Sequence, residues 1–231
     1  MTYTLTRSKR KTIALHICDG SVEVRAPLRM PRYAIDNFIA SKEKWIEKHL
    51  GRSGQQLKNR ESFSLNYGDT VYLLNTPYII TGDNRTGFLF TNNIIKQETC
   101  PPAFYIPSDL NPDQIKKACI DVYKKTAAAF LIPRTHELAS QMLVTPGIIK
   151  ITGAKSRWGS CSVDKNISFS WRLLMADEDT VDYVIIHELA HTIEMNHSQR
   201  FWEIVEKYCP NYKDSKKRLK VLQNKLANES W

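Results

Sequence analysis

The sequence predicts an α+β protein in which a β-rich N-terminal portion with one helix, residues 1–108, precedes a compact domain of helices on a small mixed sheet, residues 109–231. Three observations predict this class. Short stretches before residue 97 alternate apolar and polar side chains between turn residues, as strands do. Prolines and polar residues at 97–114 indicate a linker. From Asp113 onward the apolar residues recur mainly at helical spacing.

The elements of the first portion follow from turn residues and periodicity. "KTIALHI" and "SVEVRAP" flank Asp19-Gly20, which predicts a hairpin. A helix is expected over residues 33–50, because its apolar residues fall near helical spacing: Ile35, Phe38, Ile39, Trp45 and Ile46. Further strands are expected within residues 69–82 and 87–96.

The second portion begins with a helix over residues 113–131 that restarts at Pro133, in a first turn or at a kink. Strands are expected at 147–152 and at 166–174, where Ile167, Phe169 and Trp171 alternate with polar residues. Three helices are predicted after these strands. The first, central helix begins at Asp177, and the second begins at a Ser198 cap and stops at Pro210. The third is a basic amphipathic helix over 214–228.

The composition is that of a soluble globular protein, with 42% hydrophobic and 25% charged residues among 231. The first residues lack the apolar run of a signal peptide, and no stretch approaches the ~18 apolar residues of a membrane span. The five cysteines form no CxxC pair. We therefore expect a cytoplasmic protein without a disulfide framework, a cysteine-rich zinc module or a membrane partner.

The net charge of +9 is concentrated in "RSKRK", residues 7–11, and "KDSKKRLK", residues 213–220. These runs could bind an acidic partner such as nucleic acid, or they could be solvated faces of helices and loops. The charge alone does not decide between these interpretations, and the sequence leaves the oligomeric state open.

The segment "HELAHTIEMNHSQRFW", residues 187–202, holds three of the six histidines. His187 and His191 are four residues apart, so on a helix they lie on one face and can reach one ion at ~2.0–2.1 Å. Glu188 lies at the rim of that face, where its carboxylate could take a proton from an attacking water. His197 would be the third ligand, which leaves one position open, as in catalytic zinc sites.

The spacing from His191 to His197 poses a geometric difficulty. In the motif HExxHxxGxxH a glycine turns the chain back, and here Glu194 takes that position. On a continuous helix His197 would lie ~60° off the face of His191 and ~9 Å further along. The helix must therefore break, and we expect it to end near Met195 with Asn196 in the left-handed region. The alternative is that the three histidines are ordinary surface or core residues.

The sequence resembles the YgjP-like zinc metallopeptidases, a zincin-fold family related to SprT-type and WLM metalloproteases. The resemblance includes "GSVEVRAP", "SRWGSCS", "ISFSWRLLMA", "VDYVIIHELAH" and "NHSQRFWEIV". It implies a zincin-like domain with the HExxH helix on a small mixed sheet, one zinc ion per chain held by His187, His191 and His197, and Glu188 as the general base. The implied activity is peptide-bond hydrolysis, with "ISFSWRLL" as the edge along which an extended peptide substrate could pair.

Two alternatives stay open. A nucleic-acid or protein-binding module with a structural zinc would not need Glu188. A deformylase-like amide hydrolase would use Cys161, because "SCS" ahead of "HELAH" faintly resembles the deformylase pattern. Trp158 could line the cleft or cap the core. Candidates by type for a second oxyanion donor are Arg157, Arg172, Tyr208 and Tyr212. The structural role is favoured for each, so none is counted as catalytic.

Overall fold

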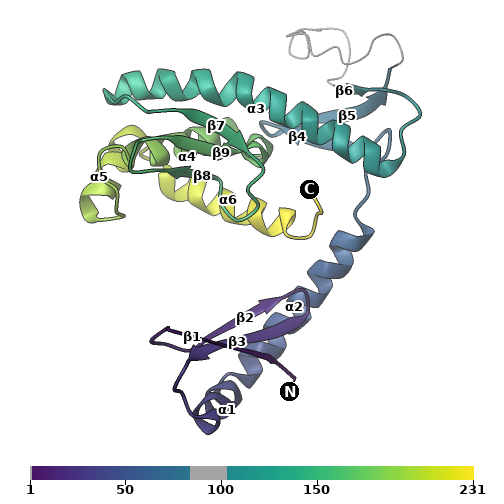
Figure 1. Cartoon of the computed structure of the whole chain (residues 1–231). Coiled ribbons are helices and arrows are strands. Elements are labelled where there is room, and N and C mark those ends of the chain that lie inside the picture. Colours follow the sequence, from purple (N-terminus) through teal and green to yellow (C-terminus); the bar gives the residue numbers. More distant parts are fainter. Residues whose placement is uncertain (1, 84–102) are drawn as a thin grey trace. The chain divides into compact units, whose positions relative to one another are not determined.

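The computed structural model describes residues 2–83 and 103–231, and it confirms the α+β class. This described part contains six α-helices and three small sheets (Figure 1). Each sheet has three strands, with one parallel and one antiparallel pairing. None of the described helices combines the length and the apolarity needed to cross a bilayer.

By compactness the chain divides into two units. The first comprises Met1–Phe63 with Lys225–Ser230, and the second comprises Ser64–Asn224 with Trp231. The division therefore falls after Phe63, whereas the sequence predicts a division after residue 108. The described strands between these two positions belong with the second compact unit. The assignment of the activity to residues 109–231 stays a prediction.

The first unit is a three-stranded sheet covered by two helices. Its strands are β1 (Thr4–Ser8), β2 (Ala14–Cys18) and β3 (Ser21–Pro27), in the order β1-β3-β2. The predicted hairpin is confirmed, and both of its turn residues, Asp19 and Gly20, have the positive φ of a two-residue type I′ turn. Apolar residues of β3 and the helices form the core: Val22, Val24, Ala26, Ile35, Ile39 and Ile46.

The predicted helix over residues 33–50 is two helices, α1 (Arg32–Ser41) and α2 (Glu43–Ser62). The Ser41 hydroxyl donates to the carbonyl oxygen of Phe38 at 2.7 Å. That oxygen would accept the Lys42 N–H in a continuous helix, but the Lys42 N–H bonds to Ile39 instead, at 3.0 Å. A local side-chain bond thus accompanies a break that the apolar spacing did not indicate.

The second unit begins with β4 (Thr70–Leu73) and β5 (Thr76–Gly82), which confirm the predicted strands at 69–82. The third strand, β6 (Ala103–Ile106), pairs parallel with β5. The linker predicted over 97–114 is therefore wrong for these four residues, because Ala103, Phe104 and Ile106 of β6 are buried in the core. The predicted strand at 87–96 lies outside the described residues.

A long helix, α3 (Pro112–Met142), runs along both sheets of the second unit (Figure 1). It starts with a capping box between Asn111 and Gln114 and continues past Pro133, where the sequence predicted a restart. The second sheet follows, with β7 (Ile149–Thr152), β8 (Gly159–Cys161) and β9 (Ile167–Ser170) in the order β7-β9-β8. The expected strand at 166–174 is shorter than predicted, because a 3-10 helix takes over at Trp171–Met175.

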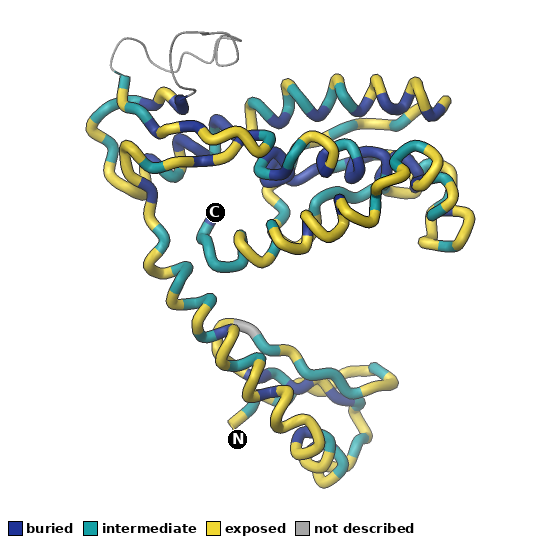
Figure 2. The backbone as a smooth tube through the Cα atoms, turned by 180° about the vertical axis from the view of Figure 1, so that it is seen from behind, coloured by how far each residue is buried: buried dark blue, intermediate teal, exposed yellow. Residues whose placement is uncertain are grey.

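Three helices complete the second unit: α4 (Glu178–Ala190), α5 (Gln199–Tyr208) and α6 (Tyr212–Leu226). The predicted Ser198 cap is present, since its side chain accepts from the N–H of Phe201 at 3.4 Å. Asp177 caps α4 in the same way, accepting from the N–H of Thr180 at 3.0 Å. α4 is buried along most of its length, whereas α6 is largely exposed (Figure 2). α4 is thus fixed on the inside of the unit.

Candidate metal centre

The end of α4 sets the position of the candidate site. The predicted break exists, but α4 ends at Ala190 rather than near Met195. The N–H groups of Thr192 and Ile193 bond to carbonyls three residues back, at 2.9 and 3.0 Å, which tightens the chain into a turn. The expected left-handed conformation of Asn196 is wrong, because its φ is not among the positive values found in the described backbone.

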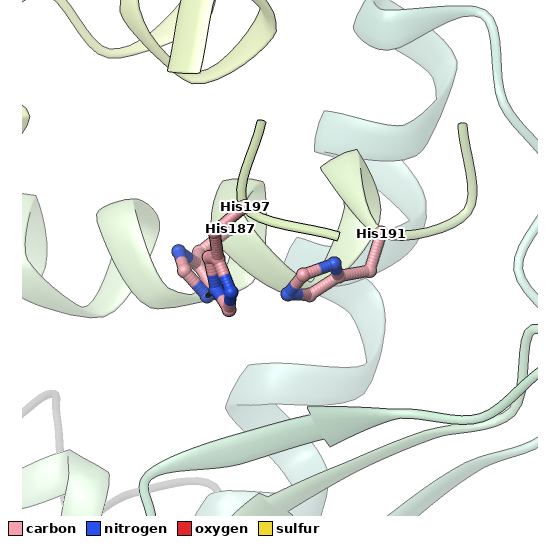
Figure 3. A group of neighbouring side chains, drawn as sticks. All are labelled: His187, His191 and His197. Atoms are coloured by element: carbon pink, nitrogen blue, oxygen red, sulfur yellow. Dashed lines mark hydrogen bonds between the residues drawn. The ribbon is translucent and has the colours of Figure 1, made fainter. Parts of the chain in front are cut away.

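The three predicted histidines lie together after this turn. Each of His187, His191 and His197 offers one nitrogen, and these nitrogens lie within 4.8 Å of one another. Figure 3 shows the rings facing one another, two from the end of α4 and one from the segment before α5. Among the described residues this is the group of histidine, cysteine or acidic side chains suited to hold a metal ion.

The spacing and the protonation of the rings fit a bound divalent ion. The Nε2 atoms of His187 and His197 are 3.1 Å apart, close to the roughly 3.4 Å between two nitrogens held at ~2.0–2.1 Å by one tetrahedral ion. Burial, the other two rings and Lys216 lower the pKa of His187 to about 3. Burial also lowers the pKa of His191. The rings of His187 and His191 are therefore neutral at pH 7, as metal ligands must be.

A backbone contact orients the ring of His191, and a helix cap fixes the chain position of His197. His191 Nδ1 lies 3.1 Å from the carbonyl oxygen of Glu194, which can only accept, so Nδ1 carries the proton and Nε2 is free to bind a metal. His187 Nδ1 is buried and has no hydrogen-bond partner in the described part of the protein. His197 directly precedes Ser198, whose side chain caps α5, so the start of that helix fixes its position.

Phe201 is the common packing partner of the three imidazoles. Its ring is fully buried and lies 4.9, 4.4 and 4.8 Å from the rings of His187, His191 and His197. The neighbouring Trp202 stacks on His197 at 5.8 Å. The histidine spacing does not point to Phe201 or Trp202, although their place in the first turn of the helix after His197 is a usable indication.

Glu188 is buried, with 6% of its surface exposed. It packs against β8, where a Cβ atom at Gly159 would lie only 2.6 Å from Glu188 Oε1. Burial raises the pKa of Glu188 to about 8, and the guanidinium of Arg157 opposes that rise. The carboxylate is outside the group of three metal-ligand atoms, so the structure separates the candidate ligands from the candidate base.

The other candidates from the sequence have different surroundings. Arg172 donates to backbone oxygens of Gly153 and Trp231, at 2.9 and 2.6 Å, which is a structural role. Cys161 lies outside the histidine cluster, and burial raises the pKa of its thiol to about 11. Tyr212 stacks on Trp202.

Two further candidates are placed by single contacts. The carbonyl oxygen of Trp158 accepts from the Ser170 N–H at 2.8 Å, and Trp158 is half-buried. Tyr208 has the ammonium of Lys207 over its ring, 5.0 Å from the centroid. None of these contacts places either residue at the histidine cluster.

The predicted substrate edge requires a correction. The expected edge is "ISFSWRLL", but its strand β9 is the central strand of its sheet and pairs with β7 on one side and β8 on the other. Its main-chain groups are therefore already engaged. The sheet ends beside α4 at β8, which contacts α4 and pairs with β9 alone within its sheet.

The chain was compared with known proteins. Among curated proteins no relative matches it. The crystal structure of the metallopeptidase zymogen of Pyrococcus abyssi abylysin matches with 23% identity and a TM-score of 0.37, over 40% of this chain and 93% of that one. That of Methanocaldococcus jannaschii jannalysin matches with 23% identity and a TM-score of 0.35, over 40% and 94%.

The model of the YgjP-like metallopeptidase domain family matches residues 11–222, which is most of the chain. Metallopeptidases hydrolyse peptide bonds with the help of a bound divalent metal. The histidine cluster lies within the matched residues. The chain therefore belongs to the YgjP-like metallopeptidase family and is a hydrolase that acts on peptide bonds.

Proposed function

We propose that the chain is a zinc-dependent peptidase in which His187, His191 and His197 hold the ion and Glu188 is the general base. The observation that supports this most directly is the convergence of three imidazole nitrogens within 4.8 Å at the end of α4. Three protein ligands leave one coordination position open, as in catalytic rather than structural zinc sites. The buried carboxylate adjacent in sequence to the first ligand supplies the base.

When bound, zinc supplies Lewis acidity, which lowers the pKa of water from 15.7 to about 7 and polarises a peptide carbonyl. The protein side chains then move one proton. Glu188 acts in its ionised form, which a cation bound beside it would favour. Its carboxylate oxygen accepts the proton from the attacking water as the new C–O bond forms, and returns it to the leaving amine nitrogen as the C–N bond breaks. Phe201 and the buried faces of the histidines exclude bulk water from one side of the site.

We place the substrate along β8. An extended peptide can add a strand to an open sheet edge through main-chain hydrogen bonds. β8 pairs with β9 alone within its sheet, and Gly159 of β8 lies directly against Glu188. A peptide paired with β8 would therefore run beside the proposed base, which a peptide on the central strand β9 could not do.

The two alternative functions predict that different residues are needed. A module with a structural zinc should work without Glu188. A deformylase-like hydrolase should need Cys161 as a ligand, although its thiol is outside the cluster and its raised pKa disfavours the thiolate that binds metal. Among the described residues, no contact supports either alternative as directly as the three converging imidazoles support the peptidase proposal.

The first test is metal content by elemental analysis of the purified wild type, His197→Ala, Cys161→Ala and a matched control, His136→Ala, which removes an exposed histidine of α3. We expect about one zinc per chain in all except His197→Ala. If His197→Ala kept its zinc and Cys161→Ala lost it, the proposed ligand set would be wrong, and the deformylase-like function would replace the proposed one.

The second test separates the base from the ligands. Glu188→Gln keeps the shape of the side chain and removes its ability to take a proton. We expect unchanged zinc content and a loss of at least about 100-fold in kcat on a peptide substrate, the usual contribution of a general base. An enzyme that keeps its rate with glutamine at this position would rule out the assigned role of Glu188.

A further inference from the structure

A hollow of about 430 Å³ lies on α5 and α6, next to the candidate metal centre. It is lined by two aromatic residues and four lysines: Trp202, Tyr212, Lys213, Lys216, Lys217 and Lys220. No acidic residue contributes to this lining. We call it the lysine pocket. Most of its lining lies on α6, which is largely exposed (Figure 2). Its four lysines are exposed.

The basic side chains of "KDSKKRLK" on α6 have two different roles. Lys213, Lys216 and Lys220 are spaced by three and four residues and share one side of α6. Arg218 is used differently, because its guanidinium contacts Asp177 at 3.1 Å and the hydroxyl of Thr180 at 2.9 Å, at the start of α4. Only the lysines therefore form a surface that is available to a ligand.

The pocket carries uncompensated positive charge. Lys217 pairs with Asp214 at 2.8 Å, and Lys213 lies 3.9 Å from Glu206. Lys216 and Lys220 have no acidic partner among the residues that the structure describes. The ammonium of Lys216 lies over the Trp202 ring, 5.0 Å from its centroid. Two lysines one turn apart are thus left to bind an anionic group.

The wall of the pocket is also a wall of the metal centre. The Trp202 ring lies 5.8 Å from the ring of His197 and 5.9 Å from that of His187, centroid to centroid. The Trp202 ring also contacts Tyr212 and Lys216, which line the pocket. A substrate whose scissile bond is at the histidines could therefore place a nearby side chain in the lysine pocket.

We propose that the lysine pocket is a specificity site that binds an acidic side chain of the peptide substrate, with Lys216 and Lys220 as its principal contacts. This inference rests on the proposed peptidase function and adds a substrate class, peptides with Asp or Glu near the cleaved bond. A carboxylate has the charge to pair with the two ammonium groups of Lys216 and Lys220.

The aromatic rings favour a peptide over single-stranded nucleic acid. Nucleic-acid sites of this kind offer aromatic faces on which bases stack. Here Trp202 already stacks on His197 and Tyr212, and Tyr212 stacks on Trp202 and Tyr183. The stacking surface is thus engaged by the protein's own side chains, while the ammonium groups of Lys216 and Lys220 are available.

The test uses pairs of peptides that differ only by Glu or Gln at one position, scanned across the cleavage site. The zinc-loaded full chain is compared as wild type, as K216Q/K220Q and as the matched control K44Q/K48Q. The control removes two exposed lysines of α2 with the same helical spacing and the same change of net charge. We expect wild type and control to prefer Glu about tenfold at one position, equivalent to 1.4 kcal/mol, and K216Q/K220Q to lose most of that preference.

Binding gives a readout that does not need turnover. Fluorescence anisotropy measures the affinity of each labelled peptide for the Glu188→Gln protein, with and without the two lysine substitutions. We expect the Glu peptide to bind about tenfold more weakly when Lys216 and Lys220 are replaced. If acidic peptides bind in this way but no peptide is ever cleaved, the proposed function fails and the lysine pocket stands.

Other outcomes overturn the lysine pocket itself. These are a wild type without preference for Glu, or a preference that K216Q/K220Q keeps as fully as K44Q/K48Q. A single-stranded oligonucleotide serves as the competitor. If it displaces the Glu peptide and its own affinity is higher and depends on Lys216 and Lys220, the site is for nucleic acid and the acidic-peptide proposal is wrong.

Discussion

At the scale of single residues, the position of the Glu188 carboxylate depends on the absence of a side chain at Gly159. A Cβ atom there would lie 2.6 Å from Oε1, 2.7 Å from Cγ and 2.8 Å from Cδ of Glu188, all closer than real Cβ contacts. Because Glu188 is buried, its side chain would have to move as a whole. We expect Gly159→Ala to reduce kcat/KM about 100-fold, the typical effect of a 1 Å misplacement, and to leave zinc content unchanged.

Gly153→Ala is the matched control for this substitution. A Cβ atom at Gly153 would meet only Trp171 Nε1, at an ordinary 3.8 Å. We expect near wild-type activity from it. Equal activity of the two alanine variants, measured on the same peptide, would show that Glu188 has room to adjust or that its position does not limit the rate.

The sequence predicted the gathering of His187, His191 and His197 better than the contact between Gly159 and Glu188. The i, i+4 spacing fixes two rings on one helix face, and the third could join them only if the helix broke. Where it breaks depends on a tight turn around Thr192, which no helix-stop residue marks. The contact of Gly159 joins a three-residue strand to a distant helix, and periodicity over so few residues carries little information.

At the scale of elements, apolar spacing identified most helices, while their ends depended on local hydrogen bonds. Residues 33–50 show this, since the Ser41 hydroxyl bond accompanies a break that the spacing does not reveal. Pro133 shows the opposite case, because α3 continues through a residue that usually interrupts a helix. The extensive burial of α3 on either side of Pro133 outweighs the local cost. Tertiary packing therefore decides what local rules leave open.

The C-terminal end of α3 is strained at Leu143. This residue caps the helix in the left-handed region, with φ 55° and ψ 41°, and its side chain is 91% exposed. A residue with a Cβ atom pays a steric cost there that glycine avoids. We expect Leu143→Gly to raise the free energy of unfolding by up to about 1 kcal/mol, less the entropy that glycine gains in the unfolded chain. Urea denaturation measures the change.

Leu143→Ala separates the backbone effect from the loss of an exposed apolar side chain. It removes the same surface but keeps the Cβ atom, so we expect no gain in stability from it. A glycine variant that is no more stable than the alanine variant would mean that the turn after α3 relaxes without strain.

At the scale of the whole molecule, the second compact unit joins segments that are far apart in the sequence. Trp231 is 7% exposed and contacts Tyr123 of α3 at 5.6 Å and Trp171 of the 3-10 helix at 6.2 Å, ring to ring. Arg172 donates to its backbone oxygen at 2.6 Å. Apolar periodicity could not predict this cluster, because a single aromatic residue beyond the last helix has no period.

We expect Trp231→Ala to lower the free energy of unfolding by about 3–5 kcal/mol, because it removes a large buried ring and leaves a cavity between Tyr123 and Trp171. Val221→Ala is the control, since Val221 is 70% exposed on α6 and its loss should change stability by less than about 0.5 kcal/mol. Denaturation followed by circular dichroism compares the two. If Trp231→Ala proved as stable as Val221→Ala, the cluster would contribute little, and the core of this unit would have to rest on α3, α4 and their sheets alone.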